Sequence, residues 1–174
     1  MLQGARVKLR AMDPDDVPTL WEYWGDVDVA MRASNRPPKP FTLEETRKVF
    51  GDLAERDDLV RFVIDAGGDV VGDCMLHSID KHNRCCEIGI ALGKPHWGKG
   101  YGQEAVSLLV AFAFEHHNMH RVGLEVLADD ERAVGCYRKA GYVEEGRFRS
   151  RDWVEGAYHD VMVMGILEEE WSGR

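Results

Sequence analysis

The sequence predicts an α+β, or mixed α/β, fold in a single domain that spans residues 1–174. Three kinds of observation support this prediction: segments with the two-residue alternation of strands, segments with the apolar spacing of helices, and glycine-containing turns between neighbouring strands. A chain of 174 residues is long enough to bury one hydrophobic core. No internal repeat, low-complexity segment or linker indicates a second domain.

The N-terminal part of the chain predicts one strand and then two helices. Arg6–Arg10 alternates as an opening strand, and Asp13-Pro14 then provides an N-cap with proline in the first helical turn. That helix carries apolar side chains at helical spacing, namely Val17, Leu20, Trp21 and Trp24. Asn35–Pro40 contains three prolines and is predicted to be irregular. A capping box that begins at Thr42 opens a second helix, which we expect to end near Arg56.

The remainder of the chain alternates between strands and helices. Gly67-Gly68 is a hairpin signal between the strands Val60–Ala66 and Asp69–Asp80. The later predicted elements are a strand at Cys85–Leu92, a helix from Gly102 to Phe114 or beyond, a strand at Arg121–Leu127, a helix at Asp130–Ala140, and a closing hairpin of Tyr142–Arg151 and Ala157–Leu167. The order β-α-α-β-β-β-α-β-α-β-β is that of an α+β or mixed α/β fold.

The composition excludes several classes of partner. A net charge of −9 argues against nucleic acid, whose phosphates require a basic face. The same charge suits a cationic amine substrate, although acidic charge also serves solubility. The first six residues lack the apolar stretch of a signal peptide, and the apolar run Leu108–Phe114 is too short to span a bilayer. We therefore expect a cytoplasmic protein with no membrane partner.

Cysteine and histidine do not predict a metal or redox site. The four cysteines lack C-x-x-C spacing, so buried free thiols are expected. His116 and His120 would share one helical face, but no third acidic or thiolate ligand accompanies them. We predict no metal site.

The glycine turn that precedes the long helix is the strongest indication of function. Glycine lets the backbone turn tightly and approach a ligand closely, and a helix that starts there presents free N–H groups and a positive dipole end. This arrangement predicts a phosphate site. The residues of the turn are Trp97, Gly98, Lys99, Gly100, Tyr101 and Gly102.

Two cofactor classes match this turn. Gly100–Ala105 satisfies the dinucleotide fingerprint G-x-G-x-x-G/A, with Glu125 near the distance of a ribose-binding acid, and this would suit an oxidoreductase. That fingerprint should follow a strand directly, whereas Pro95 intervenes and no βαβ repeat is present. Trp97-x-x-Gly100-x-Gly102 instead resembles the Q/R-x-x-G-x-G/A pyrophosphate loop of the GNAT superfamily of N-acetyltransferases.

A second motif strengthens the GNAT resemblance. Asp130–Tyr142 resembles the family signature N-x-R-A-x-x-x-Y-x-K-x-G-F, in the expected order and about thirty residues after the first motif. Glu87–Ile90 and Gly156–Asp160 further resemble the Rim-type branch, which contains ribosomal-protein and spermidine-acetylating enzymes. Two departures stand out, because Trp97 replaces Gln or Arg and Asp130 replaces Asn.

The resemblance implies the GNAT fold, with a central, mostly antiparallel sheet, and acetyl-CoA as co-substrate. The acceptor would be a primary amine of a protein N-terminus, a polyamine or another small molecule, and it would attack the thioester directly. The glycine turn would hold the pyrophosphate, with added charge from Lys99, and Asp130 would stand where a cofactor-binding Asn is customary. The strand segment Ile90, Ala91 and Leu92 would pair with the pantetheine arm and offer an N–H to the thioester oxygen.

The resemblance also indicates which side chains run the chemistry. Tyr137 aligns with the tyrosine that protonates the leaving sulfur. In an alternating strand Glu87 shares a face with Gly89 and Ala91, and a carboxylate beside two small side chains suits a general base in an open cleft. His77 on the neighbouring strand is a second candidate for the base or for a substrate contact, and a β-bulge there would change which side chains face the cleft.

The acceptor side is open to several interpretations. Met31, Phe41 and Trp153 could line an acceptor cleft, as could Trp21 and Trp24, but such residues are more often part of a core. The resemblance implies a homodimer or larger oligomer. Two alternatives to an N-acetyltransferase remain, a non-catalytic acyl-CoA sensor and the dinucleotide-dependent oxidoreductase.

Overall fold

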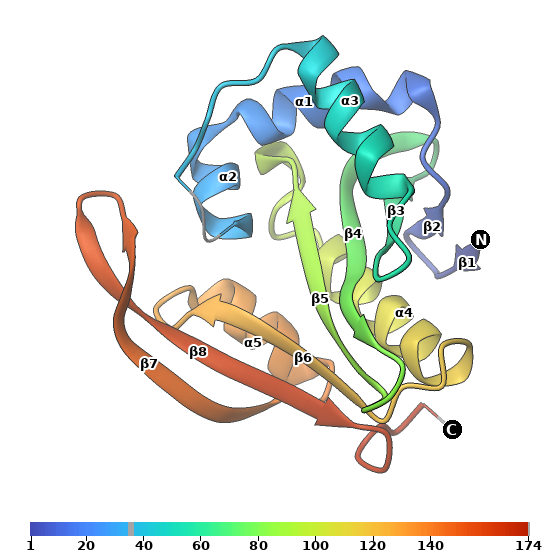
Figure 1. Ribbon diagram of the computed structural model, residues 1–174, viewed down its shortest axis with the longest axis vertical. Helices are drawn as coiled ribbons and strands as arrows, with labels where there is room; N and C mark the ends of the chain where they lie inside the picture. The colour runs from blue at the N-terminus through green and yellow to red at the C-terminus, as the bar shows by residue number, and fades with distance from the viewer. Residues whose placement is uncertain (35–36, 174) are drawn as a thin grey trace.

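The computed structural model describes residues 1–34 and 37–173. In this part of the chain eight strands form one sheet in the order β1-β2-β3-β4-β5-β6-β8-β7 (Figure 1). Neighbouring strands are antiparallel except for the parallel pair β5 and β6. The strands are β1 (Leu2–Gln3), β2 (Lys8–Arg10), β3 (Val60–Ala66), β4 (Asp69–Asp80), β5 (Cys85–Leu92), β6 (Arg121–Leu127), β7 (Val143–Val154) and β8 (Ala157–Leu167). This sheet confirms the predicted mixed α/β class, and one parallel pair is incompatible with the doubly wound sheet that the oxidoreductase alternative requires.

Helices cover both faces of the sheet. Trp24 of α1 donates from Nε1 to Asp73 of β4 at 2.8 Å, whereas the next residue, Cys74, points to the opposite face and joins the core with α4. Because successive strand residues face opposite ways, α1 and α4 lie on opposite faces. The helices are α1 (Val17–Gly25), α2 (Val27–Ala33), α3 (Leu43–Ala54), α4 (Tyr101–Glu115) and α5 (Glu131–Lys139).

Local sequence explains most of the helix ends. Thr42 forms the predicted capping box with Glu45, and α3 ends close to the expected residue. Asp13 caps a short 3₁₀ turn at Pro14–Asp16, and the α-helix proper begins only at Val17. The helix α2 was not predicted, because its start signal, an Asp26 side chain that accepts from two backbone N–H groups, lies next to the end of α1.

Two other expectations differ from the structure, and a third is confirmed for residues 37–40. The strand predicted at Arg6–Arg10 is shorter, at Lys8–Arg10, and the short strand β1 precedes it. The last helix before β6 ends at Glu115, so the side chains of His116 and His120 do not share a helical face. Of the proline-rich segment, residues 35 and 36 lie outside the described residues, and 37–40 have no regular structure.

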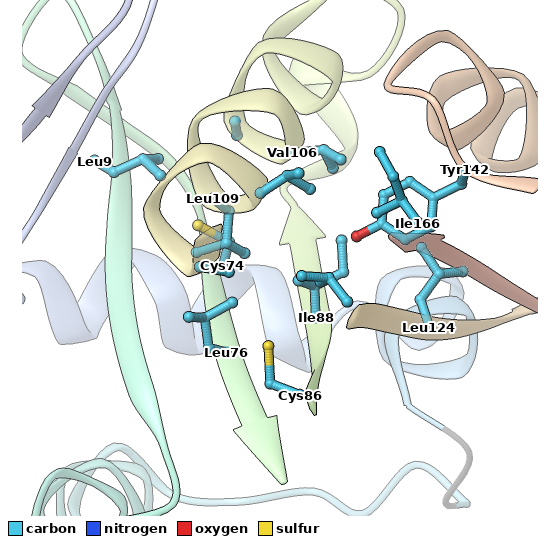
Figure 2. Close-up of a cluster of buried hydrophobic side chains, with 14 of the residues drawn as sticks. Leu9, Cys74, Leu76, Cys86, Ile88, Val106, Leu109, Leu124, Tyr142 and Ile166 are labelled. Carbon is cyan, nitrogen blue, oxygen red and sulfur yellow. The ribbon is translucent and has the colours of Figure 1, made fainter. Parts of the chain in front are cut away.

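The hydrophobic core lies between the sheet and the helices α4 and α5. Figure 2 shows Cys86 and Ile88 of β5 directed toward Val106 and Leu109 of α4. The alternation predicted for β5 is therefore confirmed, with these side chains in the core and Glu87 exposed on the other face. The Tyr142 hydroxyl is buried in this core without a hydrogen-bond partner among the described residues.

A fork between β5 and β6 positions the functional site. The two strands pair only from Cys85–Glu87 to Arg121–Gly123. Beyond Glu87 they diverge, so that their C-terminal ends point in different directions (Figure 1). Each strand keeps its outer neighbour, β4 or β8, and the facing edges remain open.

Candidate functional site

A cavity of about 410 Å³ lies at this fork. Its walls come from α2, the ends of β5 and β6, the glycine turn with the start of α4, and α5. Segments far apart in the sequence thus meet at one place. Nine of the predicted site residues line the cavity, namely Ile90, Ala91, Leu92, Trp97, Gly98, Gly100, Gly102, Asp130 and Tyr137.

The end of β5 presents backbone groups to the cavity. Gly93 donates its N–H to the carbonyl oxygen of Val71 on β4 at 3.0 Å. Because hydrogen-bonding direction alternates along an antiparallel ladder, Ile90 and Leu92 turn their N–H and C=O groups away from β4 and toward the fork. The Leu92 carbonyl accepts a hydrogen bond from Trp97 Nε1 at 2.8 Å, whereas the groups of Ile90 face the open edge.

The glycine turn has the geometry that its sequence predicts. Gly98 and Gly100 have φ angles of 74° and 84°, in the left-handed region that favours glycine. Gly100 is the N-cap of α4 and supplies no side-chain hydrogen bond, so the N–H groups of the first turn are free to bind an anion. Arg6 supports the turn from outside by donating to the Lys99 carbonyl at 3.2 Å.

Tyr137 reaches the cavity from α5. Its ring contacts that of Tyr142 edge to face, with 5.9 Å between the centroids. Burial raises the pKa of Tyr137 above its ordinary value of 10, and the neighbouring Cys136 and Asp130 contribute in the same direction. The phenol therefore stays protonated through neutral pH and can act as a proton donor.

Asp130 lies at the start of α5 and is buried. Its carboxylate accepts from the N–H of Ala133 at 3.0 Å, and it therefore caps the helix in place of the customary Asn. Two guanidinium groups lie near the carboxylate, that of Arg32 at 3.3 Å and that of Arg132 at 3.6 Å. These cations offset the acidic charge that this departure brings to the cavity.

Glu87 and His77 occupy facing positions on β5 and β4. Their side chains approach to 3.7 Å between Oε2 and Nδ1, and His77 Nδ1 is also 3.1 Å from the Ser78 hydroxyl. Glu87 is the last β5 residue that pairs with β6, so it stands at the fork, exposed and outside the cavity lining. A β4 bulge begins just after His77 and leaves this pairing intact.

The structure does not bring the proposed acceptor-side residues together. Met31 packs against an apolar cluster of Leu127, Val154 and Val161. Phe41 and Trp153 are exposed, Phe41 beneath the Lys39 ammonium and Trp153 against Tyr158. None of these three lines the cavity, and the side chains of Lys99 and Tyr101 also lie outside its lining.

Several cavity residues escaped the sequence analysis. Arg32 and Val29 lie on α2, which was not predicted. His96 contacts the Tyr23 hydroxyl at 2.9 Å through Nε2, and burial lowers its pKa. Arg132 lies inside the second motif, so a signal was available for it.

Two features of the described residues bear on other classes of function. No cluster of three or more His, Cys, Asp or Glu side chains suited to a metal ion occurs within residues 1–34 and 37–173. Over the same residues, each helix is too short or too polar to cross a membrane. All four cysteines are free thiols.

Known proteins are similar to this chain in sequence and in fold. The chain is 29% identical to the uncharacterized N-acetyltransferase p20 of Bacillus licheniformis, over 99% of this chain and 98% of the relative. It is also 29% identical to the spermidine N(1)-acetyltransferase of Vibrio cholerae, over 98% of each. A crystal structure of spermidine N-acetyltransferase from V. cholerae with CoA and spermine superposes with a TM-score of 0.88 at 23% identity, over 96% of this chain and 98% of that one. Residues 6–143 match the acetyltransferase (GNAT) domain. The chain therefore belongs to the GNAT acetyltransferase family, whose members use acetyl-CoA.

Proposed function

We propose that this chain transfers the acetyl group of acetyl-CoA to a primary amine, by direct attack of the amine on the thioester. One observation carries this proposal: an uncapped helix N-terminus, an open strand edge and Tyr137 meet at one cavity. The sheet runs without interruption from β1 to β7, which supports a single catalytic domain over residues 1–174.

Different residues of the chain hold acetyl-CoA and protonate the departing sulfur. Acetyl-CoA supplies the activated acetyl group as a thioester. The first-turn N–H groups of α4 bind its pyrophosphate, while the Ile90 N–H donates to the thioester oxygen. Tyr137 keeps its proton because burial raises its pKa, and it gives that proton to the departing sulfur.

Removal of the amine proton falls to Glu87 in this proposal. An alkylammonium group titrates near pH 10, so at neutral pH a base must take its proton directly or through water. Glu87 is accessible at the fork, and its neighbour His77 is the second candidate. Met31, Phe41 and Trp153 stay outside the lining, so we assign the inner acceptor cleft to α2 and the end of β6 instead.

The acceptor is a cationic amine in this proposal. Relatives of this chain include spermidine N-acetyltransferases and a putative ribosomal N-acetyltransferase, YdaF of Bacillus subtilis. The net charge of −9 would attract ammonium groups over a range set by ionic strength. Spermidine and a protein N-terminus are therefore the two acceptors to compare.

Release of free thiol from acetyl-CoA with a panel of amines tests the function. We expect turnover with spermidine or with short N-terminal peptides, and we expect kcat/KM to fall as salt rises. Turnover that does not respond to salt would remove the role of charge. Binding of acetyl-CoA without thiol release for any amine would favour the acyl-CoA sensor instead.

We also propose that the protein is a homodimer or a larger homo-oligomer, as in the Rim-type resemblance. The edge strand β7 is exposed over most of its length, with Val143 and Phe148 among its exposed apolar side chains. Such an edge calls for cover by another chain. Light scattering should give at least twice the mass of one 19.7 kDa chain, and a monomeric mass would contradict the proposal.

A further inference from the structure

Trp97, the first residue of the glycine turn, is stacked against a cation from α5. Trp97 stands where the family motif carries Gln or Arg. The Arg132 guanidinium of α5 lies over the Trp97 ring, with its central carbon 4.1 Å from the ring centroid. Both residues line the cavity. A positive charge is thus held beside the turn by stacking rather than supplied from within it.

In this stack the Trp97 ring is held in place, and the Arg132 guanidinium group is partly exposed. Trp97 is anchored by its Nε1 hydrogen bond to the Leu92 carbonyl at 2.8 Å, so the ring cannot turn without breaking that bond. The Arg132 side chain is 46% exposed. A guanidinium group that stacks through its face keeps its N–H donors directed outward in its plane. Those donors are therefore available to a ligand in the cavity.

The charges around the stack favour an anionic ligand. The Lys99 side chain lies outside the cavity lining, so the turn itself contributes backbone N–H groups but no lining cation. Asp130 is 3.6 Å from Arg132, yet it is also paired with Arg32 at 3.3 Å and caps α5. With that carboxylate already paired, Arg132 keeps positive charge to offer beside the uncapped start of α4.

We propose that Arg132, held in place by Trp97, binds a phosphate group of CoA beside the glycine turn. This inference rests on the proposed function for its ligand. It makes Trp97 a positioning residue and Arg132 a binding residue. It also explains why the motif's departure at position 97 is compatible with a phosphate site.

Calorimetry of CoA binding with Arg132→Gln tests the proposal. We expect the dissociation constant to rise about tenfold, the size expected for the loss of one hydrogen bond to a charged group. Arg138→Gln is the matched control, because Arg138 lies on the same helix, is 60% exposed and pairs only loosely with Glu144 at 3.9 Å. It should bind CoA as the unmodified chain does.

Two further measurements separate a phosphate contact from a general disturbance. Acetyl-pantetheine, which lacks phosphates, should bind Arg132→Gln and the unmodified chain equally. In the Arg132→Gln background, Trp97→Arg should restore CoA affinity by placing a cation at the turn. An unchanged CoA affinity in Arg132→Gln, or an equal loss for both ligands, would overturn the inference.

These outcomes are distinct from failure of the proposed function. If the unmodified chain binds CoA and Arg132→Gln binds it equally well, only the role of Arg132 fails. If Arg132→Gln weakens CoA binding but no amine releases thiol, the phosphate contact stands and the transferase proposal fails.

Discussion

On the side of the cavity formed by β5 and the glycine turn, the chain presents mainly backbone. The φ angles of Gly98 and Gly100, the uncapped start of α4 and the open edge at Ile90 require no particular side chain to face the ligand. The side formed by α2 and the end of β6 depends on side chains from segments far apart in the sequence. Val29 and Arg32 line it together with Glu125 and Val126.

This difference has a consequence for recognition of the two substrates. A backbone wall suits a ligand that is the same throughout a family, since it tolerates side-chain replacement. A wall of side chains can change its partner by a few substitutions. We therefore expect substitutions on the backbone side to change cofactor affinity, and those at the fork and beyond to change the rate or the choice of acceptor.

The largest expected effect is that of Tyr137→Phe, a side-chain change on α5. Loss of the phenol should lower kcat by roughly 10², with little change in KM or melting temperature. Because burial raises the pKa of Tyr137, this residue should cause no alkaline loss of activity below about pH 10. Steady-state kinetics from pH 6 to 10 would give kcat, KM and their dependence on pH, and thermal unfolding would give the melting temperature. Normal turnover would reassign the tyrosine to the core.

Glu87→Gln tests the side chain that stands at the fork. We expect CoA affinity to stay the same and the rate at neutral pH to fall by up to about 10², the low end of general acid–base effects. The deficit should narrow as the pH approaches the amine's own pKa near 10, because a free amine needs no base. A deficit that is constant with pH would indicate substrate binding. In that case His77→Gln is the next variant.

Gly98→Val changes only the glycine turn, on the backbone side of the cavity. At φ 74° a β-branched residue is strained by roughly 1–2 kcal/mol, and we expect CoA to bind about tenfold more weakly. Gly67→Val is a matched control, since Gly67 has φ 70° in the β3–β4 turn and, like Gly98, has no atom within 4 Å of an added Cβ. Both variants should lose similar stability by thermal unfolding. If Gly98→Val and Gly67→Val bind CoA with equal affinity, the glycine turn does not bind its phosphates.

The smallest expected effect concerns Tyr142→Phe, a neighbour of Tyr137 that does not line the cavity. Its hydroxyl is buried and has no hydrogen-bond partner within residues 1–34 and 37–173, so its removal should raise the free energy of unfolding by about 1 kcal/mol. For a chain of this size that corresponds to about 2–4 °C in Tm. Activity should not change. A lower Tm would show that the hydroxyl is satisfied in solution.

The sequence predicted the fold class and the glycine turn that lines the cavity because their signals are local. A capping box, a glycine pair and strand alternation each act over a few residues, so the strands from β3 to β6 and the turn before α4 follow directly. The helix α2 was missed because its cap at Asp26 directly follows Gly25, where one helix ends.

The acceptor side could not be predicted for a different reason. Whether an aromatic residue such as Trp153 faces a cleft or solvent depends on the path of the hairpin in three dimensions, and no local pattern carries it. The same holds for the stack of Arg132 on Trp97, whose partners lie 35 positions apart in the chain. The first motif includes Trp97 and the second includes Arg132, but the contact between the two residues depends on how α5 packs.

The open strand edges at the fork between β5 and β6 also affect the resistance of the protein to aggregation when its ligand is scarce. Two strand edges face each other there without pairing, and an unpaired edge is a template for a strand from another chain. A ligand that binds along the edge at Ile90 would occupy that template. At a concentration one hundred times its dissociation constant it would also raise the free energy of unfolding by about 2.7 kcal/mol. Supply of the co-substrate would then protect the chain against aggregation as well as feed its reaction.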